Sequence, residues 1–295
     1  MVVLAPCQAQ KVKPALKLTA GDTYYTISDI NSTVTQNLNG QQASYTIGMA
    51  AKTAFKVIDI KDTVYDMEVR YQSIGMKMQS TAGDMDFNSD RKDAQDIPSK
   101  VLAAMVDKPF LVTLSTTGRV LEVKNIEKIM ASVFDGLPQM DTLQKQQLMG
   151  QFLQSFGEKS FKSNLEQSLA IYPSVKVSKG DKWIVNTLLE SVMVADVQST
   201  YELQDITDTY YLIHGDSRIA TVRGRESQVN GMPVSYDLTG IIVSDIEADK
   251  TTGWVAEAKI KQDISGTFQI KDNPKLPGGM LVPMTVHTDM ITTDK

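Results

Sequence analysis

The sequence predicts an α+β protein in which antiparallel, β-rich sheets carry a helical layer inserted between two runs of strands. Residues 16–96 and 179–295 are strand-like, and in stretches such as residues 65–71 apolar side chains alternate with polar ones, the pattern of a strand with one buried and one solvated face. Residues 97–172 show helical spacing instead. No linker or low-complexity tract separates these parts. We therefore expect one domain over residues 11–295, whose sheets could curve into a half-barrel, with the helical insertion at about 97–172. The alternative is two small β-rich lobes joined by the helices.

Length and composition fit a globular chain with ample core. Of the 295 residues, 42% are hydrophobic and 22% charged, and a chain of this size buries about three quarters of its unfolded surface. The net charge of −5 argues against binding nucleic acid, which needs a concentrated basic surface. No apolar run approaches the length of a membrane-spanning helix. We therefore expect no nucleic-acid partner and no membrane span.

The first ten residues indicate the compartment. Cys7-Gln8-Ala9 places small residues three apart, as signal peptidase requires. We expect residues 1–10 to be the remnant of a secretory signal cleaved after Ala9, which predicts a secreted, periplasmic or outer-membrane-associated protein. The alternatives are a disordered terminus, or a lipobox in Leu4-Ala5-Pro6-Cys7 that would make Cys7 a lipid anchor. Pro6 stands where that motif normally has a small residue.

The clearest strand signal lies in the first β-rich part, over residues 65–71. Its apolar face carries Tyr65, Met67, Val69 and Tyr71, and charged residues alternate with them. Residues 55–60 should pair with this strand through a turn at 61–63. An earlier strand is expected at 24–35, and Asn39-Gly40 favours a hairpin turn.

The helical part begins at Pro98, which suits a first helical turn. A hairpin of residues 110–115 and 119–124 interrupts it, and Asn125 can cap the next helix. The apolar stripes of the following helices contain Ile126, Ile129, Met130, Val133 and Phe134, then Met140, Leu143, Met149, Phe152, Leu153 and Phe156, then Phe161, Leu165 and Leu169.

The carboxyl-terminal part has the pattern of an antiparallel meander. Turn signals recur at 179–181, 230–231 and 251–253, with strand-like segments between them. Asn230-Gly231 is the strongest hairpin signal in the chain.

The residues that carry chemistry are sparse. There is one Cys and there are two His, and neither His214 nor His287 lies near a Gly-x-Ser-x-Gly motif. The acidic segment from Asp84 to Asp90 resembles a calcium loop, but Ser89 and Gln95 stand where such a loop needs Gly and Glu. We expect no catalytic residues, no metal and no cofactor. A carboxylate-dependent hydrolase remains the rival hypothesis, because the fold sets the spacing of paired carboxylates.

Methionine is the unusual component, with 15 residues. Met fills irregular space in cores and also suits apolar ligand surfaces. The helical stripe therefore either packs on a sheet or lines an apolar cavity. The candidate cavity residues are Met130, Phe134, Met140, Leu143, Met149, Phe152, Leu153 and Phe156.

Several segments resemble an uncharacterised family of secreted proteins and lipoproteins from Bacteroides-like bacteria. They are residues 109–123, the Tyr172-Pro173 step, residues 177–183, and residues 253–258. The order of elements is also similar to that of periplasmic lipoprotein carriers, which implies a curved sheet enclosing apolar ligand beneath helices. This family implies no catalytic residues.

The leading hypothesis is therefore a secreted, non-catalytic protein that binds an apolar ligand or a protein partner in the cell envelope. A structural envelope component without a ligand is the third alternative.

Overall fold

The computed structural model describes residues 11–38, 40–91, 96–137, 140–229, 231–274 and 276–295. The expected signal remnant at residues 1–10, including Cys7, lies outside the described residues. So do Asn39 and Asn230 of the two predicted hairpin turns.

Long strands dominate the described part of the chain. They are β1 (Thr23–Leu38), β2 (Gln41–Lys61), β3 (Val64–Ser80), β4 (Gly83–Asn88), β5 (Phe110–Ser115), β6 (Val120–Lys124), β7 (Lys182–Glu190), β8 (Val194–Ile206), β9 (Tyr210–Thr221), β10 (Glu226–Val229), β11 (Met232–Asp249), β12 (Val255–Ile270) and β13 (Met280–Thr293). The helices are α1 (Ile97–Met105), α2 (Ile126–Asp135), α3 (Thr142–Phe156) and α4 (Glu158–Leu169).

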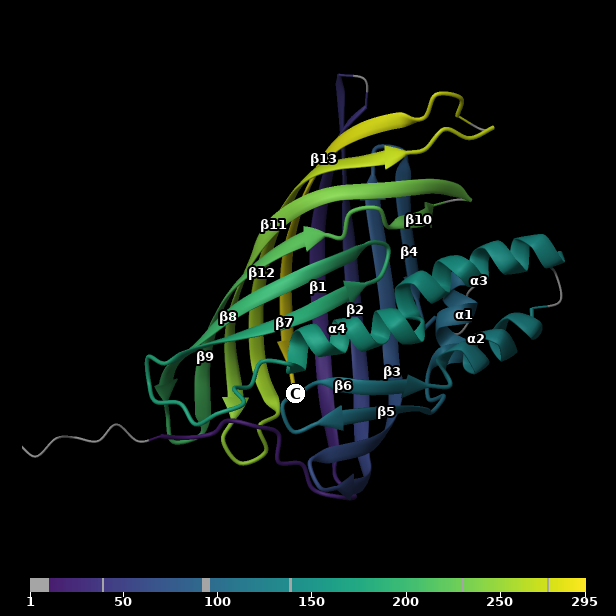
Figure 1. The fold of residues 1–295 in the computed structure, drawn as a ribbon. Helices are drawn as coiled ribbons and strands as arrows, with labels where there is room; N and C mark the ends of the chain where they lie inside the picture. Colours follow the sequence, from purple (N-terminus) through teal and green to yellow (C-terminus); the bar gives the residue numbers. More distant parts are fainter. Residues whose placement is uncertain (1–10, 39, 92–95, 138–139, 230, 275) are drawn as a thin grey trace, which may run out of the picture.

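Within the described residues, all thirteen strands belong to one sheet, in the order β6-β5-β3-β2-β1-β13-β12-β11-β9-β8-β7 (Figure 1). Strand β4 pairs with β3, and β10 pairs with β11. The strands flanking the helices do not form separate sheets, because β1 pairs antiparallel with β13 from Ile27↔Thr293 to Gln36↔Met284.

The predicted α+β class, with a helical layer between two runs of strands, is therefore wrong. The protein is a single, mostly antiparallel sheet to which short helices are added. Local periodicity located the helices but could not show that the first strand in chain order pairs with the last one. The sequence also predicted shorter strands than the structure has. Much of the length of strands such as β2 and β11 is only half-buried, so it lacks a clear alternation of buried and exposed residues.

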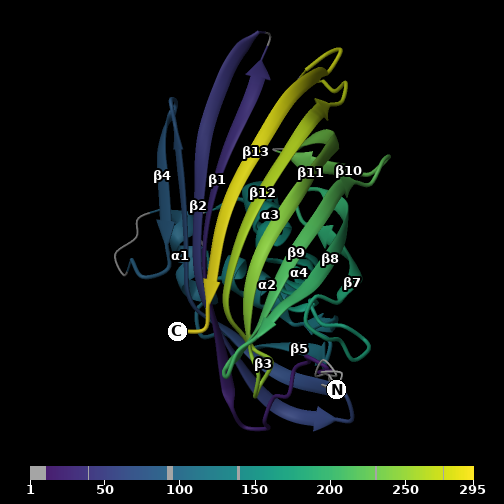
Figure 2. The ribbon, with the colours of Figure 1, turned by 90° about the vertical axis from the view of Figure 1, so that its left-hand side faces the viewer.

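The sheet is strongly curved, and the helices lie on its concave side. Figure 2 views the sheet from outside the curve and shows the helices behind the strands. Helix α4 packs against both β6 and β7, which are the two ends of the strand order. Helix α4 therefore bridges the two edge strands of the curved sheet (Figure 1).

The main core fills the end of the concave side that lies under the helices. It joins strand residues such as Phe55 and Met67 to helix residues such as Met130 and Phe134, all at most 2% exposed. The rings of Tyr71, Phe110 and Phe161 form a cluster with centroids 4.8–5.9 Å apart. The predicted apolar face of residues 65–71 is confirmed, since all four of its side chains belong to this core.

A second, smaller core lies on the same face of β8, β9, β11 and β12. Its buried members are Ala195, Val197, Ile219, Leu238 and Ile264. Strand β12 lies close to β11 at Gly266, whose φ is +148° and where a Cβ would lie 2.1 Å from the carbonyl oxygen of Asp237. Only glycine permits this close approach of β12 to β11.

Candidate functional site

The helical residues predicted to line a cavity divide into three groups. Met130, Phe134 and Phe156 are buried in the main core. Met149, Phe152 and Leu153 are half-buried and pack against the same core. The Phe152 ring lies 5.8 Å from that of Phe134 and 5.9 Å from that of Phe156, so these side chains contact one another.

Leu143 and Met140 lie apart from that set. The Leu143 side chain is 64% exposed, and Met140 precedes α3 and is half-exposed. Helical geometry explains the exposure of Leu143. Residues 149, 152, 153 and 156 follow the i, i+3, i+4, i+7 spacing of one face. Leu143 stands six residues before Met149, about a third of a turn away from that stripe.

Half-exposed apolar side chains gather on a different surface. This surface is the concave side of the sheet toward the end where the strands project past the helices. We call this set the outer concave face; it comprises Ile30, Tyr45, Ile47, Met76, Met78, Ile260, Met284, Val286 and Met290, all partly exposed. Figure 2 shows β1, β2, β12 and β13 projecting beyond the helices at this end. The helices that fill the other end therefore do not cover the strands here.

Strand register places these residues on one face. Met76 is opposite Met49 on β2, Met49 is opposite Ile30 on β1, Ile30 is opposite Met290 on β13, and Met290 is opposite Ile260 on β12. Directly opposed residues project from the same side of a sheet. Met49 packs against the main core, which fixes this side as the concave one.

The hydroxyl groups on the same face bond to each other. Ser28 and Thr292 are 3.1 Å apart, and Ser32 and Thr288 are 2.8 Å apart. These two pairs flank Ile30 and Met290 along β1 and β13. Because these hydroxyl groups already bond to each other, they do not require a polar group from a ligand. The side chains of Ile30 and Met290 between the two pairs offer apolar contact.

The two sides of the outer concave face approach each other. Burial raises the pKa of Tyr45 on β2. Burial also raises the pKa of Tyr236 on β11, and the nearby Tyr45 raises it further. Three strands separate β2 from β11 in the sheet order, so only the curvature of the sheet brings these phenols near each other. Tyr236 also stacks on Phe268, with ring centroids 6.0 Å apart.

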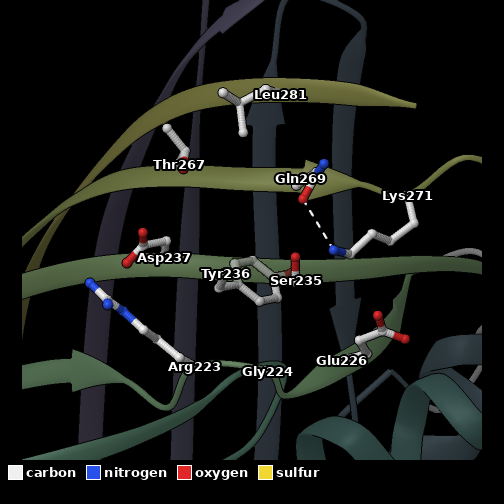
Figure 3. Close-up of a pocket in the computed structure, with 10 residues that line it drawn as sticks. All are labelled: Arg223, Gly224, Glu226, Ser235, Tyr236, Asp237, Thr267, Gln269, Lys271 and Leu281. Carbon is white, nitrogen blue, oxygen red and sulfur yellow. Dashed lines mark hydrogen bonds between the residues drawn. The ribbon is translucent and has the colours of Figure 1, made fainter. Parts of the chain in front are cut away.

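A polar pocket of about 270 Å³ lies at the edge of the same end. Figure 3 shows it lined from the β9–β10 turn, β10, β11, β12 and β13. Arg223 and Lys271 contribute positive charge, and Glu226 and Asp237 contribute negative charge. Lys271 donates to the Gln269 side chain at 3.2 Å. None of the eight predicted cavity residues lines this pocket. Its charges are of both signs and largely exposed, so water weakens any field they produce.

Both histidines lie on strands and stand between aspartates. His214 Nδ1 lies 2.7 Å from Asp245, and His287 Nδ1 lies 2.6 Å from Asp263. Asp263, followed by Asp289, raises the pKa of His287. Among the described residues, no group of three His, Cys, Asp or Glu side chains is placed to hold a metal.

Sequence reasoning missed the outer concave face. The signal was present, because Ile74, Met76 and Met78 alternate on one strand, as do Met280, Met284 and Met290. Methionine enrichment was assigned to the helices instead, since only the register shows that these separate strands share a face.

Comparison of the sequence with models of known protein families identifies the family of this chain. Residues 62–255 match the model described as "Family of unknown function (DUF6263)", and the chain belongs to that family. No curated protein matches the chain. In the described part of the chain, no helix has the length and apolarity needed to cross a membrane.

Two solved structures show distant similarity. One is the crystal structure of the COG4313 outer membrane channel from Pseudomonas putida F1, at 7% identity and a TM-score of 0.30, covering 97% of this chain and 99% of that chain. The other is the translocator domain of autotransporter NalP from Neisseria meningitidis, at 5% identity and a TM-score of 0.20, covering 94% and 90%. Such scores are too low to support an argument about fold or function.

Proposed function

We propose that this chain is a non-catalytic binding protein that holds an elongated apolar molecule, such as an acyl chain, against the outer concave face. The observation that carries the proposal is a set of half-exposed Met, Ile, Val and Tyr side chains on the concave side of a curved sheet. The set begins beside Met49 of the main core and extends onto the strand ends that project past the helices. A contiguous exposed apolar surface of this kind is typical of a binding site. Methionine adapts its shape to varied apolar ligands.

The compartment belongs to the same proposal. A secreted or periplasmic protein would meet acyl chains at the membranes of the envelope, and the small-residue pattern at Cys7-Gln8-Ala9 supports export. The proposal includes a lipid anchor at Cys7. It also includes the binding partner, which is an apolar ligand or an envelope protein.

Fluorescence of a dansyl-labelled undecanoic acid, titrated with the protein, tests the proposal. Met290→Gln places a polar group on the outer concave face, between Ile30 and Ile260. Burying one large apolar side chain contributes about 1.5–3 kcal/mol, so affinity should fall about tenfold or more.

Ile291→Gln is the matched control. Ile291 is the next residue along β13, projects to the opposite side of the sheet and is 48% exposed. Its replacement should leave affinity unchanged. Absence of saturable binding by the unmodified protein would overturn the proposal, as would equal losses from the two variants.

A further inference from the structure

The strands keep their charged side chains on the convex face of the sheet. On β12, Lys259, Lys261 and Asp263 alternate with Ile260 and Gln262. Successive side chains of a strand project to opposite faces. Because Ile260 belongs to the outer concave face, the three charged residues project to the convex side.

The other strands show the same separation. On β13, His287 and Asp289 alternate with Val286 and Met290 of the outer concave face. The register extends this assignment from strand to strand, since opposed residues project from one side of the sheet. In the described strands, no Asp, Glu, Lys, Arg or His side chain projects to the concave side.

Packing explains this separation in the main core but not on the outer concave face. In a filled core, burial alone excludes charge. The side chains of the outer concave face are only half-buried, so water reaches them. Long charged side chains are tolerated at such positions, because their apolar stems pack while their charged ends reach water. Folding alone therefore does not require this face to lack charge.

The polar groups among these apolar side chains are uncharged. Gln262 on β12 is half-exposed and lies opposite Thr288 on β13. Gln36 on β1 is also half-exposed and lies opposite Met284. An amide group both donates and accepts hydrogen bonds, which suits an uncharged hydroxyl or ester oxygen.

The polar pocket does not supply the missing charge. Asp237 lies opposite Thr267 and is the chain neighbour of Tyr236, whose own partner on the concave side is Phe268. Glu226 lies opposite Ser235, which also neighbours Tyr236. The carboxylates of the pocket therefore lie on the other face of the sheet from the outer concave face.

We propose that the outer concave face selects uncharged lipids, such as long-chain alcohols, esters and glycerides, over lipids whose charged group would lie on it. This specificity rests on the proposed function, which places an apolar chain on the same face. An ion that leaves water for a surface without a counter-ion loses hydration and gains no partner. An alcohol or ester loses much less, and the amide groups can bond to its oxygen atoms.

Displacement of the uncharged dye N-phenylnaphthylamine tests the specificity. Dodecanol and dodecanoate carry chains of equal length, and the carboxyl group of dodecanoate is ionised at about pH 8. Dodecanol should displace the dye from the unmodified protein at a free concentration at least about tenfold lower.

A cation introduced on the face should reverse this preference. Gln262→Lys places an ammonium group beside the bound chain, so dodecanoate should bind at least about tenfold more tightly, while dodecanol should gain nothing. Ser265→Lys is the matched control, because Ser265 is exposed, lies on the same strand and projects to the convex side. It should leave the affinities for both lipids unchanged. If Gln262→Lys does not fold, Thr288→Lys replaces it, since Thr288 lies opposite on β13.

The outcomes separate this specificity from the proposed function. If the dye shows no saturable binding, both fail together. If the dye binds and dodecanoate displaces it as well as dodecanol does, the specificity alone is overturned. The same conclusion follows if the concave and convex lysine variants change the affinity for dodecanoate equally.

Discussion

Gly118 lies directly against the backbone of Leu169, so that a Cβ at position 118 would be 1.7 Å from the Leu169 carbonyl oxygen. Gly118 belongs to the turn between β5 and β6, and Leu169 ends α4. This contact fixes the end of the helix that joins the two ends of the sheet. The next residue strengthens the connection, because Arg119 donates to the carbonyl oxygen of Asn186 on β7 at 2.7 Å.

Gly118→Ala should therefore destabilise the protein by about 3 kcal/mol or more, because a backbone atom has to move to make room. Gly180→Ala is the matched control. Gly180 has a similar positive φ of +86°, but nothing lies within 4 Å of its Cβ position. It should show only backbone strain, about 1 kcal/mol. Urea denaturation of both variants measures the difference, and equal losses would show that the contact with Leu169 can relax.

Two helical side chains that the sequence assigns to one apolar set should behave differently. Phe134 is 2% exposed in the main core, so Phe134→Ala should cost about 3–5 kcal/mol. Leu143 is 64% exposed, so Leu143→Ala should change stability by less than about 0.5 kcal/mol. Thermal unfolding measures both variants. A large loss from Leu143→Ala would place that side chain in the core.

The pKa of His287 should depend on Asp263, which lies on the neighbouring strand β12. Asp263 and Asp289 raise its pKa above the ordinary 6.5. The stability that this imidazolium contributes is therefore present below 6.5 and is lost as pH rises through the higher folded-state pKa. Asp263→Asn should lower the pKa of His287, as measured by NMR titration of the imidazole protons. Asp245→Asn, which alters the partner of His214 instead, should leave the His287 titration unchanged.

Local structure was largely predictable from the sequence. The hairpin of residues 55–71 forms as expected, with Lys61 opposite Val64, and Pro98 lies in the first turn of α1. These features depend on neighbours in sequence, where alternation and turn preferences act. The register also pairs Val229 with Met232, on either side of the predicted turn whose Asn230 lies outside the described residues.

Distant relationships were not predictable in the same way. The pairing of Ile30 with Met290 joins residues far apart in the chain, and period-two alternation in each strand is compatible with many partners. The same limit hid the outer concave face, since Met76 and Met290 share a surface only through the register of the strands between them. The predicted cap of α2 was wrong, because Asn125 adopts φ +78° and makes no capping hydrogen bond.

The pairing of β1 with β13 has a consequence for how the protein is made. During synthesis, β1 emerges early, while its neighbour β13 is the last of the described strands to appear. Until then, one edge of β1 and one edge of β12 expose unpaired backbone groups, which are prone to pair with other chains. Strands β1 and β13 both lie outside the segment 62–255 that the family model matches. A nascent chain stalled before Met280 would therefore be an aggregation hazard, because both of those edges would stay unpaired.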